Sequence, residues 1–402
     1  MHEVLVVGGG IGGLTLALEL RRRNIACRVF EAAPEIKPLG VGVNLLPHAT
    51  KILAELGLER ALARVAVETA ASHFYNRFGQ LIYQEPLGRH AGLGWPQFSI
   101  HRADLQQALL GRAGPVELGK QCVAFEQDTN GVTLRFADGS SARGAAAVAC
   151  DGIHSVLRRQ LFPQDGPPRY SGVNMWRGVT RWPPYLGGAT MVRAGWLATG
   201  KMVIYPIRNH ADGTQLVNWV FEIETPKYQQ WDWNRNARVE DFFAHVAQWR
   251  FDWLDIPAML RAAEMVLEYP MVDKDPLARW THGRVTLLGD AAHPMVPRGS
   301  NGAGQAIVDA RALADELARA EAPPALAAYE AKRLEPTSNV VLENRRNPPD
   351  AILREIYERT GDKPFGRVDE VISPAELREI SEHYKRVAGY DRESLKQQEG
   401  TR

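Results

Sequence analysis

The sequence predicts an α/β fold with a dinucleotide-binding unit, an inserted β-rich region and C-terminal helices. Three observations support this prediction. An apolar strand at residues 3–7 runs into a glycine-rich turn and then into a helix-forming run. From Met175 to Glu222 the chain changes to β-rich segments with many Trp and Tyr residues. Beyond Pro348 it is charged, polar and helical in pattern. With 402 residues, the chain is long enough for two domains.

The first element is a glycine-rich turn placed between a strand and a helix. It has the pattern G-x-G-x-x-G in the residues Gly8, Gly9, Gly10, Ile11, Gly12 and Gly13. Gly8 allows a sharp turn, and Gly10 lets the backbone approach a pyrophosphate. Gly13 lets the helix pack closely on the strand. The free N–H groups at the start of the helix face an anion, so the turn predicts a phosphate-containing ligand.

The second strand, Cys27–Phe30, is followed directly by Glu31, which stands 18 positions after Gly13. An acidic side chain at this place accepts hydrogen bonds from ribose hydroxyls and repels a 2′-phosphate. The ligand is therefore FAD or NAD. The alternative is a glycine-rich turn that binds no ligand.

Composition limits the kind of protein. Hydrophobic residues make up 45% of the chain and charged residues 24%, which is typical of a soluble globular protein. The formal charge of +1 favours neither nucleic acid nor an anionic membrane as a partner. The three cysteines form no C-x-x-C pair, so we expect no disulfide framework and no metal site. With no signal peptide or membrane-spanning run in the sequence, we expect a cytoplasmic protein.

Further elements follow from hydrophobic periodicity and turn residues. In the first half we expect a helix at 48–65, a hairpin at 74–84, a helix at 103–110, strands at 121–148 with a turn at Asp138-Gly139, and a buried strand at 145–150. In the second half we expect strands at 202–207 and 216–223, a helix at 239–249, a strand at 269–273, and helices at 304–317 and 326–346.

A second apolar strand, Arg284–Leu288, is closed by Gly289-Asp290. The chain then passes Pro297, Gly299 and Gly302 before the helix at 304–317. Glycines ahead of a helix expose backbone N–H groups at its positive end. This segment therefore predicts a second site for an anion or a dipole.

Three separate elements occur together in this chain: the turn with Glu31, the segment that begins at Asp151-Gly152, and the segment from Gly289 to Pro294. In this order they resemble the flavin-dependent aromatic hydroxylases, single-component FAD monooxygenases of the p-hydroxybenzoate hydroxylase type. The resemblance covers residues 3–345. It implies a Rossmann-like FAD-binding domain at 1–73, 98–175 and 270–346, a β-rich substrate domain at 74–97 and 176–269, and a C-terminal helical tail at 347–402.

The resemblance also implies a role for each matching residue. Asp290 resembles the aspartate that binds the ribityl chain, and Arg102 the arginine that reaches the pyrophosphate. Asp151-Gly152, with Ser155 and Arg158, resembles the family's second fingerprint, which is tied to FAD and to docking of the nicotinamide nucleotide. The full set of implied cofactor-binding residues is Gly8, Gly10, Ile11, Gly12, Gly13, Glu31, Gly42, Arg102, Val123, Asp151, Asp290, Pro297, Gly299 and Gly302.

The middle of the chain resembles the phenazine hydroxylase branch of the family, in Met175–Gly178 and in 216–220 and 269–276. This implies a fused aromatic heterocycle or an aromatic acid as substrate. The implied pocket residues are Arg177, Trp219 and Pro297, and Tyr205 is the candidate catalytic residue. The alternative for Tyr205 is a core residue. We expect His293 to be a hydrogen-bonded structural residue.

The resemblance implies a reaction sequence. NADH or NADPH reduces the FAD, O2 adds at the flavin C4a, and the distal oxygen of the hydroperoxide passes to the ring of a small aromatic substrate. One alternative is a flavoprotein oxidase or dehydrogenase of the same architecture, and another is a non-catalytic dinucleotide-binding sensor. We expect no nucleic-acid or membrane partner, and either a monomer or a homodimer.

Overall fold

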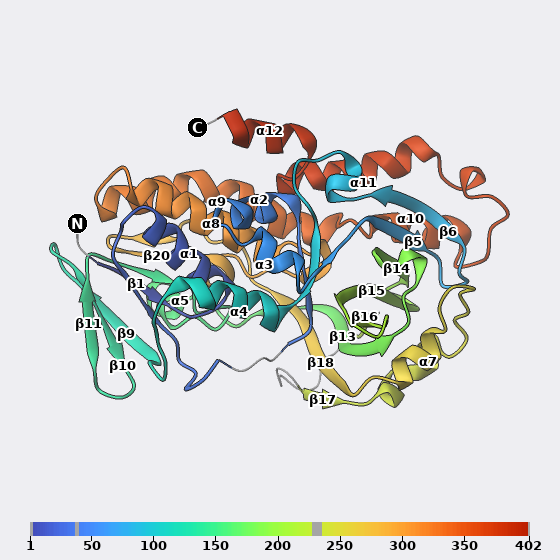
Figure 1. Ribbon diagram of the computed structural model, residues 1–402, viewed down its shortest axis with the longest axis horizontal. Helices are drawn as coiled ribbons and strands as arrows, with labels where there is room; N and C mark the ends of the chain where they lie inside the picture. The colour runs from blue at the N-terminus through green and yellow to red at the C-terminus, as the bar shows by residue number, and fades with distance from the viewer. Residues whose placement is uncertain (1–2, 37–39, 227–234, 401–402) are drawn as a thin grey trace.

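The computed structural model describes residues 3–36, 40–226 and 235–400. A six-stranded sheet lies in one half of the molecule, with the order β19-β20-β12-β1-β2-β8 (Figure 1). Its strands are β1 (Val4–Val7), β2 (Cys27–Phe30), β8 (Val116–Glu117), β12 (Ala146–Ala149), β19 (Thr281–His282) and β20 (Val285–Leu287). Strand β1 pairs in parallel with β2 and β12, and β12 with β20. The predicted Rossmann-like sheet is thus present.

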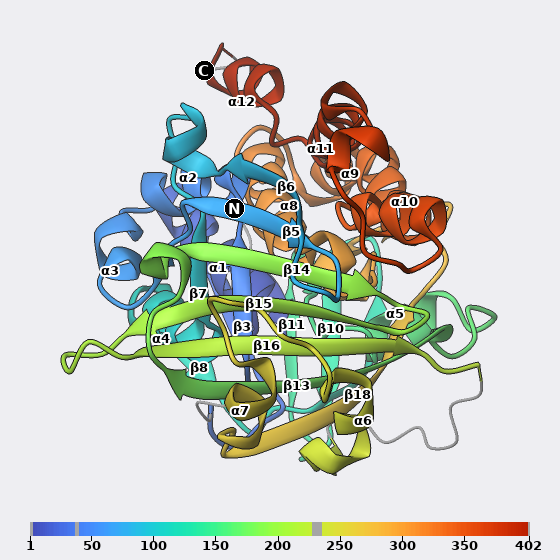
Figure 2. The ribbon, with the colours of Figure 1, turned by 90° about the vertical axis from the view of Figure 1, so that its right-hand side faces the viewer.

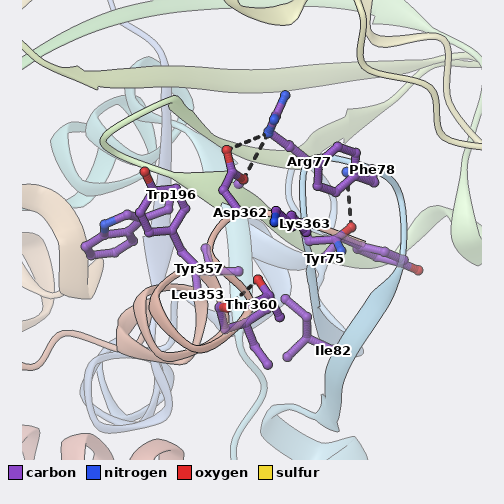
Figure 3. Close-up of a pocket in the computed structure, with 13 residues that line it drawn as sticks. Tyr75, Arg77, Phe78, Ile82, Trp196, Leu353, Tyr357, Thr360, Asp362 and Lys363 are labelled. Atoms are coloured by element: carbon purple, nitrogen blue, oxygen red, sulfur yellow. Dashed lines mark hydrogen bonds and ion pairs between the residues drawn. The ribbon is translucent and has the colours of Figure 1, made fainter. Parts of the chain in front are cut away.

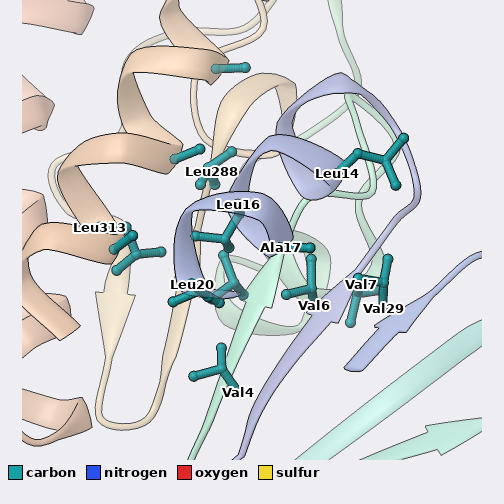
Figure 4. Close-up of a cluster of buried hydrophobic side chains, with 14 of the residues drawn as sticks. Val4, Val6, Val7, Leu14, Leu16, Ala17, Leu20, Val29, Leu288 and Leu313 are labelled. Carbon is teal, nitrogen blue, oxygen red and sulfur yellow. The ribbon is translucent and has the colours of Figure 1, made fainter. Parts of the chain in front are cut away.

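Three helices pack around this sheet and bury its apolar side chains. They are α1 (Ile11–Arg22), α4 (Arg102–Ala113) and α8 (Gly302–Leu317), and α1 contacts both of the others. Figure 4 shows Leu16 and Leu20 of α1 between the strands and Leu313 of α8. Each fully buried Leu or Val contributes about 1.5–3 kcal/mol through the hydrophobic effect. This core fixes the glycine-rich turn over the carboxyl ends of the parallel strands.

Smaller elements complete this half of the molecule. They are a sheet of β9 (Cys122–Gln127), β10 (Val132–Phe136) and β11 (Ser141–Gly144), a sheet of β3 (Gly42–Leu45), β4 (Val67–Glu68) and β7 (Phe98–His101), and helix α5 (Val156–Leu161). The single helix predicted at 48–65 is two helices, α2 (Pro47–Glu55) and α3 (Glu59–Ala63). Gly57 separates them with a φ of +76°, which ends the first helix.

An eight-stranded sheet forms the other half, with the order β17-β18-β13-β16-β15-β14-β5-β6 (Figure 2). Its strands are β5 (Ala71–Tyr75), β6 (Leu81–Pro86), β13 (Arg169–Trp182), β14 (Thr190–Trp196), β15 (Gly200–Asn209), β16 (Gln215–Glu224), β17 (Arg235–Ala237) and β18 (Met265–Asp273). Several of these strands are longer than the short segments that the sequence predicts. The expected domain limits at 73, 175 and 269 fall inside β5, β13 and β18, all three of which are strands of the eight-stranded sheet.

One face of this sheet is covered by an aromatic cluster that includes Trp219, Phe221 and Trp249. The segment over that face holds η3 (Val239–Asp241), α6 (Phe243–Val246) and α7 (Ile256–Arg261), so the helix predicted at 239–249 is shorter and irregular. The opposite face turns toward the dinucleotide half. It carries the side chains that reach the site described below.

The C-terminal helices pack against both halves. They are α9 (Ala322–Arg346), α10 (Ala351–Thr360), α11 (Pro374–Ala388) and α12 (Arg392–Gly400). Helix α9 packs on α8, and α10 packs on β14 and β5 of the large sheet (Figure 2). Among the described residues, no helix has the length and apolar character needed to cross a membrane.

Candidate functional site

A cavity of about 530 Å³ lies between the two sheets, within the range typical of ligand sites. Ten of the predicted site residues line it: Gly10, Ile11, Gly12, Gly42, Arg102, Arg177, Tyr205, Asp290, Pro297 and Gly302. They come from the glycine-rich turn, from β3, α4, β13 and β15, and from the segment before α8. The tertiary structure therefore brings to one space residues that are separated by up to three hundred positions in the chain.

The glycines of the turn have different physical reasons to be glycine. Gly8 has a φ of +109°, and a Cβ there would lie 2.3 Å from the carbonyl oxygen of Cys150. A Cβ on Gly13 would lie 2.0 Å from the Gly8 oxygen, so this residue allows the helix to approach the turn. Gly10 lines the cavity, and a Cβ there would meet no atom within 4 Å. The space in front of Gly10 is therefore open to a ligand.

Glu31 stands at the end of β2, beside the turn. Its carboxylate accepts hydrogen bonds from the backbone N–H groups of Gly9 at 2.7 Å and of Ala33 at 2.9 Å. These bonds fix an acidic side chain next to the start of α1. Glu31 is not among the residues that line the cavity, so its contact with a ribose stays a prediction.

The Asp151 segment connects the turn to the last motif. One oxygen of Asp151 accepts from the backbone N–H of Val156 at 2.8 Å, at the start of α5, and its buried Oδ1 has no hydrogen-bond partner among the described residues. Arg158 is buried, and its guanidinium donates to the carbonyls of Ala291 and Ala292 at 3.0 and 2.9 Å. The second and third sequence motifs are therefore joined directly by one side chain.

Asp290 opens onto the cavity from the end of β20. The Asp290 side chain is exposed within the cavity between the two halves, and no hydrogen bond to its carboxylate is present within the described part of the chain. Burial raises its pKa, while the positive charges of His293 and Arg102 act in the opposite direction. An ionised carboxylate in this position is free to accept hydrogen bonds from a ligand, and the hydroxyls of a ribityl chain would be suitable donors.

His293 has the structural role expected from the sequence. Its ring lies 2.5 Å from the carboxylate of Asp309 on α8, and both residues are buried. Asp309 also accepts from the backbone N–H of Gly289 and from Arg333. This buried network fixes the start of the Gly289-Asp290 segment relative to α8.

Tyr205 lies where the large sheet meets β3. It is 4% exposed, and its hydroxyl donates to the carbonyl of Gly42 at 3.1 Å. Arg177 donates to the same carbonyl at 3.1 Å, and Asn218 accepts from the Gly42 N–H at 2.7 Å. Burial raises the pKa of Tyr205, and the positive charge of the nearby Arg177 offsets only part of this rise. The Tyr205 hydroxyl is therefore protonated at neutral pH and stands at the cavity wall.

A second, smaller cavity of about 50 Å³ shares Arg177, Tyr205, Pro297 and Ser300 with the large one. Its remaining lining residues are Met175, Arg193, Lys201, Val203, Val220, Glu222 and Arg298. Of its charged residues, Arg177 was predicted from the sequence, whereas Arg193, Lys201, Glu222 and Arg298 were not. Strand alternation was the available signal, because residues 201, 203 and 205 share one face of β15 and residues 218, 220 and 222 share one face of β16.

The structure corrects the prediction that Trp219 lines the substrate pocket. On β16 it lies between Asn218 and Val220, which face the site, so its own side chain points to the other face of the sheet. It is fully buried in the aromatic cluster and donates to Thr180.

Five further predicted residues also lie outside the cavity lining: Gly8, Gly13, Val123, Asp151 and Gly299. Val123 is on β9 and is 46% exposed. Gly299 turns toward the C-terminal helices, where a Cβ would lie 1.6 Å from the Tyr384 hydroxyl.

These features define a class of protein: a dinucleotide-dependent oxidoreductase with its reaction space between a Rossmann-like domain and a β sheet. The family described as FAD binding domain matches residues 1–344, and the chain belongs to this family of FAD-dependent aromatic hydroxylases. The resemblance predicted from the three motifs is thereby confirmed. The open backbone at Gly10 and the donor-free carboxylate of Asp290 fit FAD in this cavity.

Relatives and solved structures agree with this family over nearly the whole chain. Phenazine 1,6-dicarboxylic acid hydroxylase of Lysobacter antibioticus is 38% identical over 85% of this chain and 89% of the relative. 6-Hydroxynicotinate 3-monooxygenase of Bordetella bronchiseptica is 30% identical over 84% and 89%. A salicylate hydroxylase substrate complex has a TM-score of 0.74 at 26% identity, covering 97% of this chain and 98% of that one.

Proposed function

We propose that this FAD-dependent monooxygenase hydroxylates an electron-rich aromatic acid that binds between Tyr205 and the loop before α8. The observation that carries the proposal is the cavity itself. The glycine-rich turn, Asp290 and Tyr205 line one space although they belong to distant parts of the chain. One end of that space suits a dinucleotide, and the other end is lined by the large sheet.

Several residues of the cavity suit FAD. The N–H groups at the start of α1, at Ile11 and Gly12, would bind the pyrophosphate, and Arg102 adds a positive charge. Asp290 would accept from the ribityl hydroxyls, and Glu31 from the ribose. When bound, FAD supplies the redox chemistry, which takes a hydride from NADH or NADPH and uses O2 to oxygenate the ring.

The helix α8 adds an electrostatic contribution. It begins at Gly302, which lines the cavity, and its 16 residues align their peptide dipoles toward that point. The helix N-terminus carries a partial positive charge. Negative charge that develops at this end of the site during the reaction would be stabilised by these backbone N–H groups.

Tyr205 is the candidate residue for the proton of the substrate. A ring hydroxyl or amine becomes a better nucleophile when a neighbouring group shares its proton. Because burial raises the pKa of Tyr205, this residue would act as a neutral hydrogen-bonding partner and not as a strong base. Its bond to the Gly42 carbonyl holds the hydroxyl in place.

The charges of the small cavity favour an anionic substrate. Four cationic side chains line it: Arg177, Arg193, Lys201 and Arg298. Lys201 and Arg298 pair with the carboxylates of Glu222 and Asp350, whereas Arg177 and Arg193 form no ion pair with a carboxylate among the described residues. Guanidinium groups bind carboxylates with two parallel hydrogen bonds. The relatives named for phenazine 1,6-dicarboxylic acid, 3-amino-4-hydroxybenzoate and 6-hydroxynicotinate support an aromatic acid, including a fused heterocycle. The three free cysteines support a reducing compartment such as the cytoplasm.

The first test concerns the cofactor. The purified protein should be yellow, and Asp290→Ala should lose flavin. Asp315→Ala is a matched control, because Asp315 lies on α8 and pairs with Arg23 away from the cavity. A colourless wild type that takes up no FAD during refolding, or flavin retention by Asp290→Ala, would contradict the proposed cofactor site.

The second test concerns the reaction. A panel of phenazine-1-carboxylate, 3-amino-4-hydroxybenzoate, 6-hydroxynicotinate and 3-hydroxybenzoate is incubated with NADH or NADPH under isotopically labelled O2. We expect at least one acid to accelerate nucleotide oxidation and to gain one labelled oxygen, measured by mass spectrometry. The matched 3-hydroxybenzyl alcohol lacks the carboxylate and should react more slowly than 3-hydroxybenzoate. Stoichiometric hydrogen peroxide without an oxygenated product across the panel would favour the oxidase alternative.

A further inference from the structure

The C-terminal helices make two contacts with the loop that lines the cavity. This loop, residues 296–301, contains the short helix η5 (Pro297–Gly299). On one side, Pro297, Ser300 and Asn301 line the large cavity. On the other side, the loop faces α9, α11 and the segment between α9 and α10. The two sides connect the C-terminal helices to the site.

The first contact is a buried carboxylate, Asp350, located between α9 and α10. It is fully buried and interacts with Arg298 of the loop at 3.4 Å and with Lys201 of β15. Lys201 is also bound at 2.6 Å by Glu222. Arg298 and Lys201 both line the small cavity. Asp350, which is not among the lining residues, therefore pairs with two of the cationic side chains of that cavity.

The second contact is a buried pair, Tyr384 of α11 and Asn344 of α9. The Tyr384 hydroxyl donates to the Asn344 side chain at 2.6 Å, and Asn344 donates to the Val296 carbonyl at 3.4 Å. The pair packs directly on Gly299, where a Cβ would lie 1.6 Å from the Tyr384 oxygen. No side chain larger than hydrogen fits between the loop and this pair.

The loop itself requires such support. Ser300 has a φ of +54° and a ψ of +31°, a left-handed conformation that is unfavourable for a residue with a Cβ. Backbone strain of this kind persists only where surrounding contacts determine the conformation. Asp350 contacts the loop two residues before Ser300, through the side chain of Arg298. The Tyr384–Asn344 pair contacts the loop at Gly299, the residue directly before Ser300.

We propose that Asp350 and Tyr384 are positioning residues that hold the 296–301 loop in its cofactor-binding conformation. The C-terminal region then contributes to cofactor binding by fixing the conformation of this loop. This inference rests on the proposed function, in which FAD binds along this loop.

The test measures the dissociation constant of FAD for the full-length protein, by flavin fluorescence, and the visible absorption spectrum of the bound flavin. The variants are Asp350→Asn and Tyr384→Phe. Each has a matched control in the same C-terminal region. Asp362→Asn, just after α10, breaks the ion pair with Arg77 (Figure 3), and Ser381→Ala, on α11 like Tyr384, removes a hydroxyl that donates to Glu85. Both controls leave the loop contacts intact.

We expect Tyr384→Phe to bind FAD about fivefold more weakly than wild type, or ~1 kcal/mol, as expected for one lost hydrogen bond, with an altered flavin spectrum. Asp350→Asn should weaken binding by at least about fivefold with the same spectral change, because it removes the buried charge that pairs with Arg298 and Lys201. The controls should stay within about twofold of wild type, which is below the effect of one hydrogen bond. If Asp350→Asn does not fold, Asp350→Glu replaces it and should bind more weakly than wild type, because its longer side chain displaces Arg298.

Wild-type binding by either loop variant would overturn this inference, and so would equal weakening by a control. If Asp290→Ala retains FAD, the proposed cofactor site fails instead. The two failures are thus distinguishable.

Discussion

Replacing Arg158 with Met tests whether one buried side chain holds the second and third motifs together. Arg158 is 1% exposed. Its guanidinium makes four hydrogen bonds, two to the Asp165 carboxylate and two to the carbonyls of Ala291 and Ala292. Met keeps an unbranched chain of similar length but removes all four donors. The neighbouring Arg159 is exposed and provides a matched control in Arg159→Met.

The size of the effect follows from what each partner loses. Asp165 keeps the ammonium group of Lys274, so its carboxylate is not left without a charge partner. The two carbonyls lose their donor, and an unsatisfied buried acceptor costs about 1–3 kcal/mol. For two such carbonyls we therefore expect Arg158→Met to lower the free energy of unfolding by ~2–6 kcal/mol, which overlaps the range of about 3–5 kcal/mol for breaking a buried ion pair. Arg159→Met should change it by less than about 0.5 kcal/mol.

The assay is urea denaturation followed by tryptophan fluorescence, with flavin release recorded on the same samples. The Arg158→Met protein should release FAD at lower urea, because the Asp290 segment loses its anchor to α5. Equal unfolding curves for the two variants, or wild-type flavin release by Arg158→Met, would refute the role assigned to this residue.

Three more predictions follow from the site. Gly13→Ala should destabilise the fold by about 1–3 kcal/mol in a thermal denaturation assay, because its Cβ would overlap the Gly8 oxygen; Gly10→Ala should keep wild-type stability and bind FAD more weakly, and equal stability loss in both would contradict this. In the free protein the pKa of Asp290 is raised above its ordinary value of 3.8. FAD binding should weaken as the pH falls below this raised pKa, because the ribityl hydroxyls of FAD would donate hydrogen bonds to the ionised carboxylate. Titration of FAD at several pH values should lose this dependence in Asp290→Ala. Tyr205→Phe should keep its flavin but release hydrogen peroxide in place of part of the hydroxylated product, and an unchanged product yield per NADH consumed would assign Tyr205 to the core.

Much of the dinucleotide half could be predicted from local patterns. The turn at Gly8–Gly13, the strand before it and the helix after it are specified by nearby residues, so their positions agree with the structure to within one or two residues. The predicted helix at 48–65 was wrong in one detail, because Gly57 ends a helix that periodicity alone would continue. The long strands of the second half were predicted as short segments, because long-range pairing and not local pattern determines their length.

The site residues divide in the same way. Gly10, Asp290 and Tyr205 could be selected because each stands in a motif or on a segment that resembles a known family. Trp219 was predicted as a pocket residue although its side chain lies on the other face of β16, since the sequence does not state which face of a strand meets the cavity. Lys201 could be selected only through its strand alternation with Tyr205, and Asp350 carries no local signal of a role. They become neighbours only when the C-terminal helices pack on the large sheet.

By itself, therefore, the sequence determined the chemistry of the cofactor end: a glycine turn, an acidic strand end and a family whose members use FAD. The tertiary structure alone decided which side chains meet at the other end, and that the helices beyond α9 support the loop there. The physical reason is the range of the interactions. Backbone turns and helix starts depend on residues a few positions apart, whereas a buried ion pair such as Lys201–Asp350 depends on the packing of the whole chain.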